Sequence, residues 1–305
     1  MMQESRLTLA NGVVIPNICF GGGIVHTYRH SDESLFDYAK YKMKTRLKNK
    51  KQYLLDTNFT KNVHICMQNG ITMFDTSKAY RDGEYELGRV LKSYSRDQYF
   101  IVTKASNTDQ FKGNIRKALE ESLKAMDMTY IDLYLLHWPV SDIWINSWLE
   151  MEKLYQEGLC KAIGVCNCNI HHLEELKHHA QILPMVNEFE CHPLFTQESL
   201  RSYCEENHIQ VMAYTATARM DDRLRKTVIV PIAQKYNKTI SQIILRWHQQ
   251  IGNIPIFNSS NPEHVKSNAE LSDFTLTADE IKKISAININ SRLRYDPDNC
   301  DFRQL

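Results

Sequence analysis

Short apolar runs typical of β-strands alternate with longer segments of helical spacing through most of this 305-residue chain. There are eight such strand-then-helix units, and their strands lie roughly 20 to 35 residues apart. Strands that alternate with helices form parallel βαβ units, so eight units predict an α/β fold, a closed (β/α)8 TIM barrel. The expected strands are 15–20, 71–75, 98–104, 130–137, 160–165, 185–190, 209–214 and 254–257, and the expected helices include 60–69 and 222–236.

An antiparallel hairpin is expected ahead of the barrel, because Asn11-Gly12 is a strong turn signal between two short strands within residues 6–19. The runner-up architecture, a doubly wound sheet, normally carries G-x-G-x-x-G between its first strand and helix. The glycines at 21–23 lack that spacing, and no helix follows them directly. We therefore expect one barrel domain that spans residues 1–305.

One segment, at about 24–59, interrupts the alternation and is roughly 30 residues longer than a barrel loop needs. Tyr38, Tyr41 and Leu47 predict an amphipathic helix within it. One interpretation is a solvated helix that decorates the barrel. The other is a cap that favours an anionic substrate, because the loop after the first strand emerges on the catalytic face. The basic residues of this segment are Lys40, Lys42, Lys44, Arg46, Lys48, Lys50 and Lys51.

Composition narrows the partners and the location. The formal net charge of +1 gives no electrostatic reason to expect nucleic acid or an anionic membrane as the main partner. Residues 1–6 are polar and no apolar run has the length of a membrane span, so a cytoplasmic location is expected. The eight cysteines lack the regular framework of a small secreted domain and are interpreted as buried thiols. A monomer or a weak homo-oligomer is expected.

No metal site is expected, although four histidines share one predicted helix, 170–180. No acidic or thiol ligand is placed in the sequence to complete a zinc site with them, so a solvated helix face is the better interpretation. These histidines are His171, His172, His178 and His179.

The second, third and fourth strands end in chemically active residues, namely Asp75, Lys104 and His137. Tyr80 lies on the loop after the second strand. Strand ends converge on one pocket in a barrel, so these four side chains are expected to meet. A tyrosine pKa near 10 is too high for efficient proton transfer, and a nearby ammonium would lower it. With the imidazole orienting a carbonyl oxygen, the group predicts protonation of that oxygen as a hydride reaches its carbon.

Six motifs in order make the chain resemble the aldo-keto reductase family, and its bacterial members in particular, over nearly all 305 residues. The resemblance implies Tyr80 as general acid, Lys104 and Asp75 tuning it, His137 orienting a small carbonyl substrate, and Trp138 lining the substrate pocket. The motifs are Asp-Thr-x-x-x-Tyr at 75–80, Val-Thr-Lys at 102–104, Asp-Leu-Tyr-Leu-Leu-His-Trp-Pro at 132–139, Ala-Ile-Gly-Val-Cys-Asn at 162–167, Val-Asn-Glu-Phe-Glu-Cys-His-Pro at 186–193 and Pro-Glu-His-Val at 262–265.

The resemblance also implies a nicotinamide site formed by Cys166, Asn167, Glu188 and Tyr214. Two of these depart from the family pattern, which has serine where Cys166 stands and glutamine where Glu188 stands. A glutamate still accepts a hydrogen bond from an amide N–H2, whereas a thiol bonds more weakly than a hydroxyl. Tyr214 stands where the family stacks an aromatic ring on the nicotinamide.

At the adenosine end the resemblance implies Asn258, Ser259, His264 and Asn268. The family's lysine and arginine that face the 2′-phosphate are replaced here by Asn258 and His264. Two charge-assisted contacts at about 1.5–3 kcal/mol each are lost, at most roughly 3–6 kcal/mol. That corresponds to about two to four orders of magnitude in NADPH affinity. We therefore expect relaxed selectivity, with NADPH or NADH as cofactor.

Two functional alternatives accompany the reductase interpretation. A non-catalytic dinucleotide-binding barrel, acting as a sensor or subunit, is consistent with the altered 2′-phosphate site and the basic insertion. A metal-dependent barrel hydrolase would need several histidines and carboxylates at strand ends, where only His137 and Asp75 are evident. The intact set of four catalytic residues favours the reductase, but the sequence does not identify its substrate.

Overall fold

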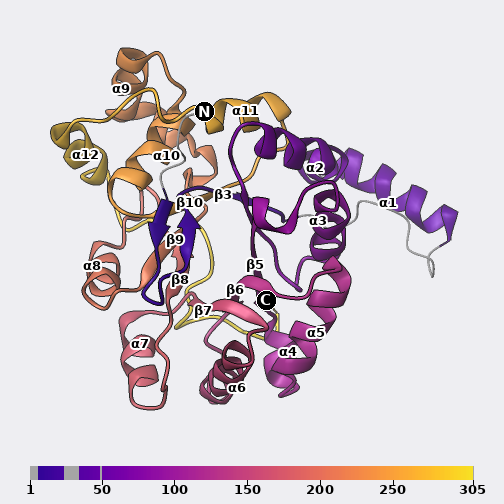
Figure 1. The fold of residues 1–305 in the computed structure, drawn as a ribbon. Coiled ribbons are helices and arrows are strands. Elements are labelled where there is room, and N and C mark those ends of the chain that lie inside the picture. Colours follow the sequence, from indigo (N-terminus) through magenta and orange to yellow (C-terminus); the bar gives the residue numbers. More distant parts are fainter. Residues whose placement is uncertain (1–5, 24–33, 49, 305) are drawn as a thin grey trace.

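The computed structural model describes residues 6–23, 34–48 and 50–304. Eight parallel strands close into a barrel in the order β10-β3-β4-β5-β6-β7-β8-β9, and Figure 1 shows the helices surrounding them. The predicted (β/α)8 barrel is confirmed. Its strands are β3 (Cys19–Gly21), β4 (Met73–Asp75), β5 (Phe100–Ala105), β6 (Ile131–Leu136), β7 (Cys160–Cys166), β8 (Val186–Glu190), β9 (Gln210–Tyr214) and β10 (Ile254–Phe257).

The N-terminal hairpin is also confirmed, with β1 (Arg6–Thr8) antiparallel to β2 (Val14–Pro16). One boundary was predicted wrongly. Ile15 pairs with Leu7 in the hairpin, so the first barrel strand begins at Cys19 and not at residue 15. Apolar residues suited to a strand stand on both sides of Pro16-Asn17, so the pattern does not show that the chain changes partner there.

The helices follow the strands as expected, and several begin with side-chain caps. Thr239 and Thr277 each accept a backbone N–H three residues on, which satisfies a donor that the helix leaves free. The helices are α1 (Leu35–Lys48), α2 (Lys50–Gln68), α3 (Gly83–Leu91), α4 (Asn107–Phe111), α5 (Ile115–Met126), α6 (Trp144–Gln156), α7 (Ile170–Lys177), α8 (Glu198–Glu206), α9 (Ile229–Tyr236), α10 (Ile240–Gln250), α11 (Pro262–Ala269) and α12 (Ala278–Ser285), with 3-10 turns at Arg96–Gln98, Ala218–Met220 and Asp222–Lys226.

Two helical predictions need correction. The stretch 222–236 was expected to be one helix, but an extended residue, Thr227, separates the 3-10 turn Asp222–Lys226 from α9. The helix expected at 60–69 is α2, which begins at Lys50, because no proline or glycine interrupts the segment before Gly70.

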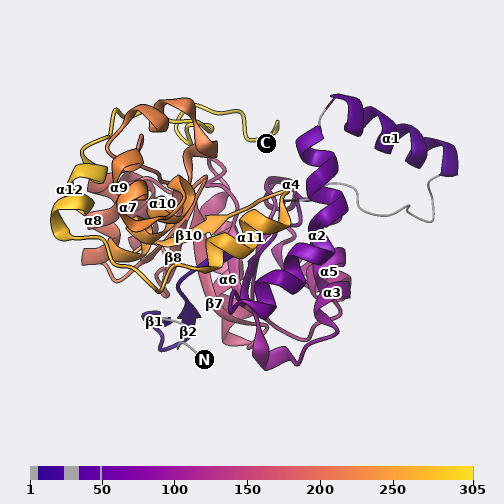
Figure 2. The same ribbon diagram turned by 90° about the horizontal axis from the view of Figure 1, so that it is seen from above.

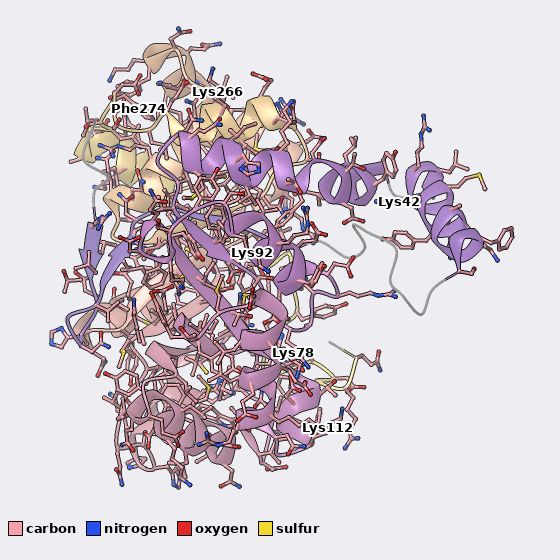
Figure 3. All side chains as sticks on the ribbon, turned by 45° about the vertical axis from the view of Figure 1, so that its right-hand side comes forward. Lys42, Lys78, Lys92, Lys112, Lys266 and Phe274 are labelled. Carbon is pink, nitrogen blue, oxygen red and sulfur yellow. The ribbon has the colours of Figure 1, made fainter. Side chains whose placement is uncertain are left out.

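The described part of the insertion forms α1 and the first turns of α2. Figures 1 and 2 show α1 standing away from the barrel, and its packing contacts are with α2. Tyr41 donates to Asp56 Oδ2 (3.3 Å), and Lys42 lies over the Tyr53 ring at 5.8 Å (Figure 3). Leu47, by contrast, is 78% exposed. The predicted helix is confirmed, but Leu47 does not pack against the protein core.

The C-terminal half of α2 packs against the barrel. Phe59, Val63 and Cys66 are buried in the core. On the same helix, Asn58 and Asn62 donate to the backbone oxygens of Ser260 (2.8 Å) and Ser259 (2.9 Å). The helix that carries the insertion therefore also braces the loop after β10.

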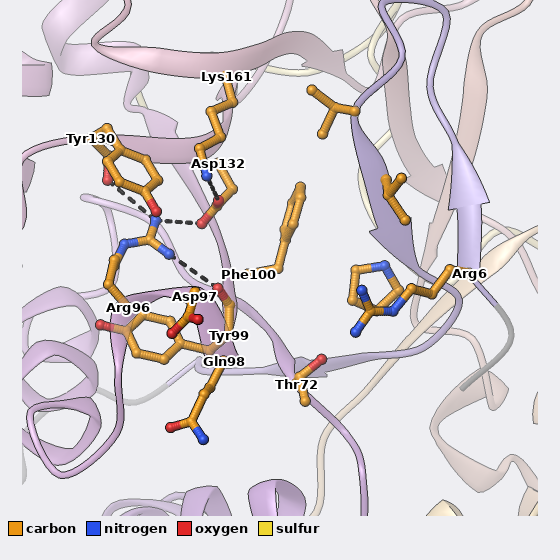
Figure 4. Close-up of a pocket in the computed structure, with 13 residues that line it drawn as sticks. Arg6, Thr72, Arg96, Asp97, Gln98, Tyr99, Phe100, Tyr130, Asp132 and Lys161 are labelled. Atoms are coloured by element: carbon orange, nitrogen blue, oxygen red, sulfur yellow. Dashed lines mark hydrogen bonds and ion pairs between the residues drawn. The ribbon is translucent and has the colours of Figure 1, made fainter. Parts of the chain in front are cut away.

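A cavity of about 360 Å³ lies beneath the barrel, between the hairpin and the N-terminal ends of the strands (Figure 4). Three of its charged groups form one network. The buried Asp132 pairs with Arg96 and with Lys161 (3.3 Å), and it accepts the N–H of Ile101 (2.9 Å). The Arg96 guanidinium also lies over the ring of Tyr130 at 4.0 Å. Because this face lies opposite the carboxyl ends of the strands, we assign the network to stability.

Within the described ranges no helix is long and apolar enough to cross a membrane.

Candidate active site

A cavity of about 700 Å³ opens at the carboxyl ends of the barrel strands, where the sequence places the reactive residues. Residues from β4, β8, β9 and β10 and from the loops that follow strands contribute to it. The predicted site residues that line it are Asp75, Tyr80, His137, Asn167, Glu188, Tyr214, Asn258, Ser259 and His264.

Lys104 lies behind this lining and pairs with Asp75. Asp75 is opposite Val102 in the β4–β5 ladder, and Lys104 is two residues further along the same face of β5. The ammonium bonds to Asp75 and donates to the backbone oxygen of Thr76 (3.0 Å). Burial lowers the pKa of Lys104, but the carboxylates of Asp75 and Glu188 outweigh it and hold that pKa well above its usual value. Lys104 is therefore a fixed buried cation.

Tyr80 sits on a tightly braced loop after β4. Its N–H donates to Ser77 O (2.8 Å), and a Cβ on the nearby Gly83 would lie 2.6 Å from Thr76 Oγ1. Burial raises the pKa of Tyr80 above its usual value, while Lys104 lowers it and Asp75 raises it. The expectation of a lowered pKa is therefore wrong for this arrangement, because burial outweighs the ammonium. Tyr80 is a neutral phenol that holds its proton.

His137 follows β6 and lies beside Tyr80, with ring centroids 6.1 Å apart. Its Nδ1 is 3.3 Å from Ser77 Oγ, and that oxygen already accepts the N–H of Ala79 (3.1 Å). The Ser77 hydroxyl can accept the Ala79 N–H and still donate its own proton to Nδ1, an arrangement that places the His137 proton on Nε2. Burial, assisted by Lys104 and Arg294, lowers the pKa of His137 to about 3. The imidazole is neutral at pH 7 and can donate a hydrogen bond from Nε2 to a carbonyl oxygen.

Asn167, Tyr214 and Glu188 form the neighbouring wall of the cavity. Asn167 Nδ2 donates to His137 O (3.0 Å), and its Oδ1 accepts from the Tyr214 hydroxyl (2.6 Å). Glu188 Oε2 is a buried acceptor without a well-aligned donor among the described residues. An amide N–H2 fits such an acceptor, so these residues suit the carboxamide of a nicotinamide. Cys166 is buried behind them, beside Glu188 in the β7–β8 ladder.

The adenosine end departs from this pattern of buried, paired groups. Asn258 and His264 are exposed at the cavity, and Ser259 is half-buried. Asn268 is buried in α11, where its Oδ1 accepts from Ser241 Oγ (3.0 Å). Three polar residues, none of them a lysine or an arginine, therefore reach the cavity wall from this end.

Trp138 is not among the cavity-lining residues. It packs in a small cluster with Val140 and Phe302, with the Trp138 and Phe302 rings 6.2 Å apart. Its predicted role in binding substrate stays a prediction.

Four residues near the reactive groups were not anticipated from the sequence. Ser77 orients His137, while Arg81, Arg219 and Arg294 line the cavity. Arg81 directly follows Tyr80, which is a local signal that was available. Arg294 reaches the cavity only because the C-terminal tail folds back over it, and no periodicity in the sequence predicts that path.

Two of the four histidines considered for a metal, His171 and His172, gather with a carboxylate from the tail, Asp298. The sequence did not anticipate Asp298, whose Oδ1 is 3.2 Å from His171 Nε2. His172 Nδ1, however, accepts the N–H of Asn169 (3.1 Å), so the ring proton is on Nε2. That nitrogen has no lone pair for a metal in the neutral ring, which argues against a metal centre.

A closed (β/α)8 barrel with a phenol, an ammonium, a carboxylate and a neutral imidazole at its mouth defines a class of oxidoreductase that protonates carbonyl oxygens. The sequence comparisons agree. The model of the Aldo/keto reductase family matches residues 44–289, and the chain belongs to that family. It is an NAD(P)H-dependent oxidoreductase that reduces carbonyl groups.

Characterised relatives include two bacterial reductases. The chain is 38% identical over 244 residues to "Glyoxal reductase" of Bacillus subtilis (strain 168), which covers 80% of this chain and 88% of that protein. It is 38% identical over 241 residues to "Methylglyoxal reductase DkgA" of Salmonella typhimurium, covering 77% and 86%.

Solved structures of the family superpose on nearly the whole chain. MGS-M4, an aldo-keto reductase from a Medee basin deep-sea metagenome library, gives a TM-score of 0.83 with 32% identity over 97% of this chain and 99% of that one. The Bombyx mori aldo-keto reductase AKR2E4, in complex with NADP, gives 0.80 with 27% identity over 98% and 97%.

Proposed function

We propose that this chain reduces small reactive aldehydes, with 2-oxoaldehydes such as methylglyoxal and glyoxal as the substrate class, and that Tyr80 is the general acid. The observation that carries the proposal is the placement of Tyr80 and His137 side by side above the buried Asp75–Lys104 pair. The names of the bacterial relatives support the substrate class. We also infer one domain over 1–305, interrupted by the insertion at about 24–59.

The proposed roles follow from the protonation states. His137 donates from Nε2 to the substrate oxygen and places it against the Tyr80 hydroxyl. Tyr80 gives its proton to that oxygen as the carbonyl carbon is reduced, and the resulting phenolate is stabilised by the Lys104 ammonium, which Asp75 keeps charged. The nicotinamide, when bound, supplies the hydride. Asn167, Glu188 and Tyr214 hold its carboxamide and ring, with Cys166 behind them.

We further propose that both NADPH and NADH serve. Asn258 and His264, which stand where the 2′-phosphate would lie, carry no fixed charge, while Ser259 offers a polar contact at the cavity wall. This arrangement favours neither dinucleotide strongly. The alternative of a non-catalytic dinucleotide-binding barrel is less favoured, because its binding function alone gives no reason for a complete set of proton-transfer groups.

As the finer part of the proposal, an aldehyde that also carries an anionic group should bind more tightly than a neutral one, and the arginines support this better than the insertion does. Arg81, Arg219 and Arg294 line the cavity, and none of them forms an ion pair with another residue in the described ranges. The described residues of the insertion, in contrast, do not line it.

The test compares wild type with Tyr80→Phe in NAD(P)H oxidation, using methylglyoxal, 4-nitrobenzaldehyde and 4-carboxybenzaldehyde. Loss of the phenolic proton should lower kcat at least about 100-fold and leave dinucleotide affinity, measured by fluorescence, nearly unchanged. Equal turnover by the two proteins would refute the role of Tyr80. The two benzaldehydes form a neutral and an anionic pair, and a lower KM for the carboxylate supports an anionic substrate, whereas a higher KM rejects it.

A further inference from the structure

Lys104 has a second carboxylate beside it, one that the family pattern lacks. Glu188 Oε2 is 3.4 Å from Lys104 Nζ. Lys104, Asp75 and Glu188 are all almost completely buried, with 1%, 4% and 4% exposure. Two carboxyl groups therefore share one ammonium in a site from which bulk water is excluded.

The charge of this trio requires that one carboxyl keeps a proton. A fully ionised trio would bury a net negative charge, which is strongly unfavourable. The Asp75 and Glu188 carboxyls are within hydrogen-bonding reach of each other, and a carboxylic acid and a carboxylate that share one proton resolve the imbalance. Burial, followed by the charge of Asp75, raises the pKa of Glu188 to about 8. Glu188 therefore ionises at a lower pH than Tyr80, whose pKa burial raises above its usual value.

The trio also occupies the ammonium. Lys104 donates hydrogen bonds to Asp75 and to the Thr76 oxygen, and Glu188 Oε2 attracts the same ammonium from 3.4 Å without forming a well-aligned hydrogen bond. Within the described chain no hydrogen bond joins Lys104 to the Tyr80 hydroxyl. Glu188 thus competes with Tyr80 for the cation that would make the phenol more acidic, and its own charge raises the pKa of Tyr80.

We propose that Glu188 is a positioning residue that holds Lys104 away from Tyr80 until an amide N–H2 engages the Glu188 carboxylate. The free acceptor Oε2 fits the carboxamide of a nicotinamide, so dinucleotide binding would release Lys104 toward the phenol. This link to the dinucleotide rests on the proposed function. The competition for Lys104 in the free protein does not.

The other titratable groups around Glu188 are neutral and do not change the net charge of this buried cluster. Two are thiols whose pKa values burial raises well above the usual range, and two are phenols whose pKa values burial also raises, so all four are neutral at pH 7. The titratable groups that face Glu188 are Cys19 from β3, Asp75 from β4, Tyr80 from the following loop, Lys104 from β5, Cys166 from β7 and Tyr214 from β9.

The pH dependence of stability follows from the raised pKa. Between an unfolded value of about 4.3 and the folded value, the folded chain binds more protons than the unfolded chain. The contribution of Glu188 to the free energy of unfolding is therefore complete at pH values below the unfolded pKa. It is lost as the pH rises toward the folded pKa of about 8. Replacing the carboxyl with an amide removes this slope.

The test uses Glu188→Gln, with Glu190→Gln as the matched control on the same strand. Glu190 is also buried, but it pairs with His192 and with the N–H groups of Leu293 and Arg294 instead of Lys104. The pKa of Tyr80 is measured in protein without dinucleotide, from tyrosinate absorbance of each variant minus that of its Tyr80→Phe counterpart. Urea unfolding at several pH values from 5 to 8 gives the change of the unfolding free energy with pH.

In Glu188→Gln the pKa of Tyr80 should fall by at least about one unit and the loss of stability with pH should be shallower than in wild type. Glu190→Gln should leave the pKa of Tyr80 at the wild-type value. An unchanged Tyr80 titration in Glu188→Gln would overturn the proposal. If Glu188→Gln does not fold, Glu188→Met, which also removes the charge, is judged by the same criteria.

A second arm adds NADP⁺ and separates the two proposals. In wild type the dinucleotide should lower the pKa of Tyr80, whereas in Glu188→Gln it should have little further effect. If NADP⁺ binds without moving the pKa in wild type, the release step is wrong. If no dinucleotide binds at all, the proposed function fails, while the competition measured in the first arm still stands.

Discussion

The two ends of the active-site cavity are built in opposite ways. At the reacting end, Asp75 and Lys104 are buried at the ends of adjacent strands, and each keeps the other charged. At the adenosine end, Asn258 and His264 are exposed side chains on a loop and a short helix. Buried charges depend on their partners, so changing one disrupts the chemistry, whereas exposed polar residues can change at little cost. We therefore expect the cavity to specify the reaction more tightly than it specifies the dinucleotide.

The adenosine end is nevertheless held in place. Asn58 and Asn62 bond to the backbone of Ser260 and Ser259, so the loop position depends on α2 and not on its own side chains. A charge restored at Asn258 should therefore find the loop already positioned.

The largest effect is expected at Asn258, at the adenosine end. Asn258→Lys adds a cation beside the 2′-phosphate position, and one charge-assisted contact is worth about 1.5–3 kcal/mol. NADPH should bind roughly 10- to 100-fold more tightly, with solvent screening favouring the lower value. NADH affinity should change little. Fluorescence titration of both dinucleotides measures the change.

The control for this prediction is Gln181→Lys, which adds the same charge on the exposed loop before β8. It should leave both affinities near the wild-type values. If Asn258→Lys strengthens NADH and NADPH binding equally, the residue does not face the 2′-phosphate and the contrast between the two ends is weakened.

A smaller effect is expected at the reacting end from Ser77→Ala. The mutation removes the hydroxyl that bonds to His137 Nδ1, so the imidazole loses the partner that fixes its tautomer. One such hydrogen bond is worth about 0.5–1.5 kcal/mol, which is roughly a 2- to 10-fold loss in kcat/KM. Ser77→Thr keeps the hydroxyl and should retain more activity than Ser77→Ala. Wild-type kcat/KM in Ser77→Ala would show that His137 does not need this contact.

The barrel and its reactive residues could be predicted because both depend on local patterns. The alternation of strand and helix fixes which residue ends each strand, and Asp75, Lys104 and His137 stand at those positions. The change of strand partner between Ile15 and Cys19 could not be predicted, because pairing is decided by residues far away in the chain.

Two further features of the site could not be predicted from the sequence. Arg294 and Asp298 meet residues more than a hundred positions away only because the tail folds over the barrel. The raised pKa of Tyr80 depends on how deeply the phenol is buried, and no motif reports burial. The motifs predicted Tyr80 as the proton donor but gave the wrong direction for its pKa.

The contrast between the two ends is tested most directly by the Kd values of wild-type protein for NADPH and NADH, measured side by side at one salt concentration. A reacting end that is fixed beside an adenosine end without fixed cations predicts two Kd values within about one order of magnitude of each other. A preference for NADPH of tens-fold or more would contradict the account, because it would mean that the 2′-phosphate is still recognised without the lysine and arginine.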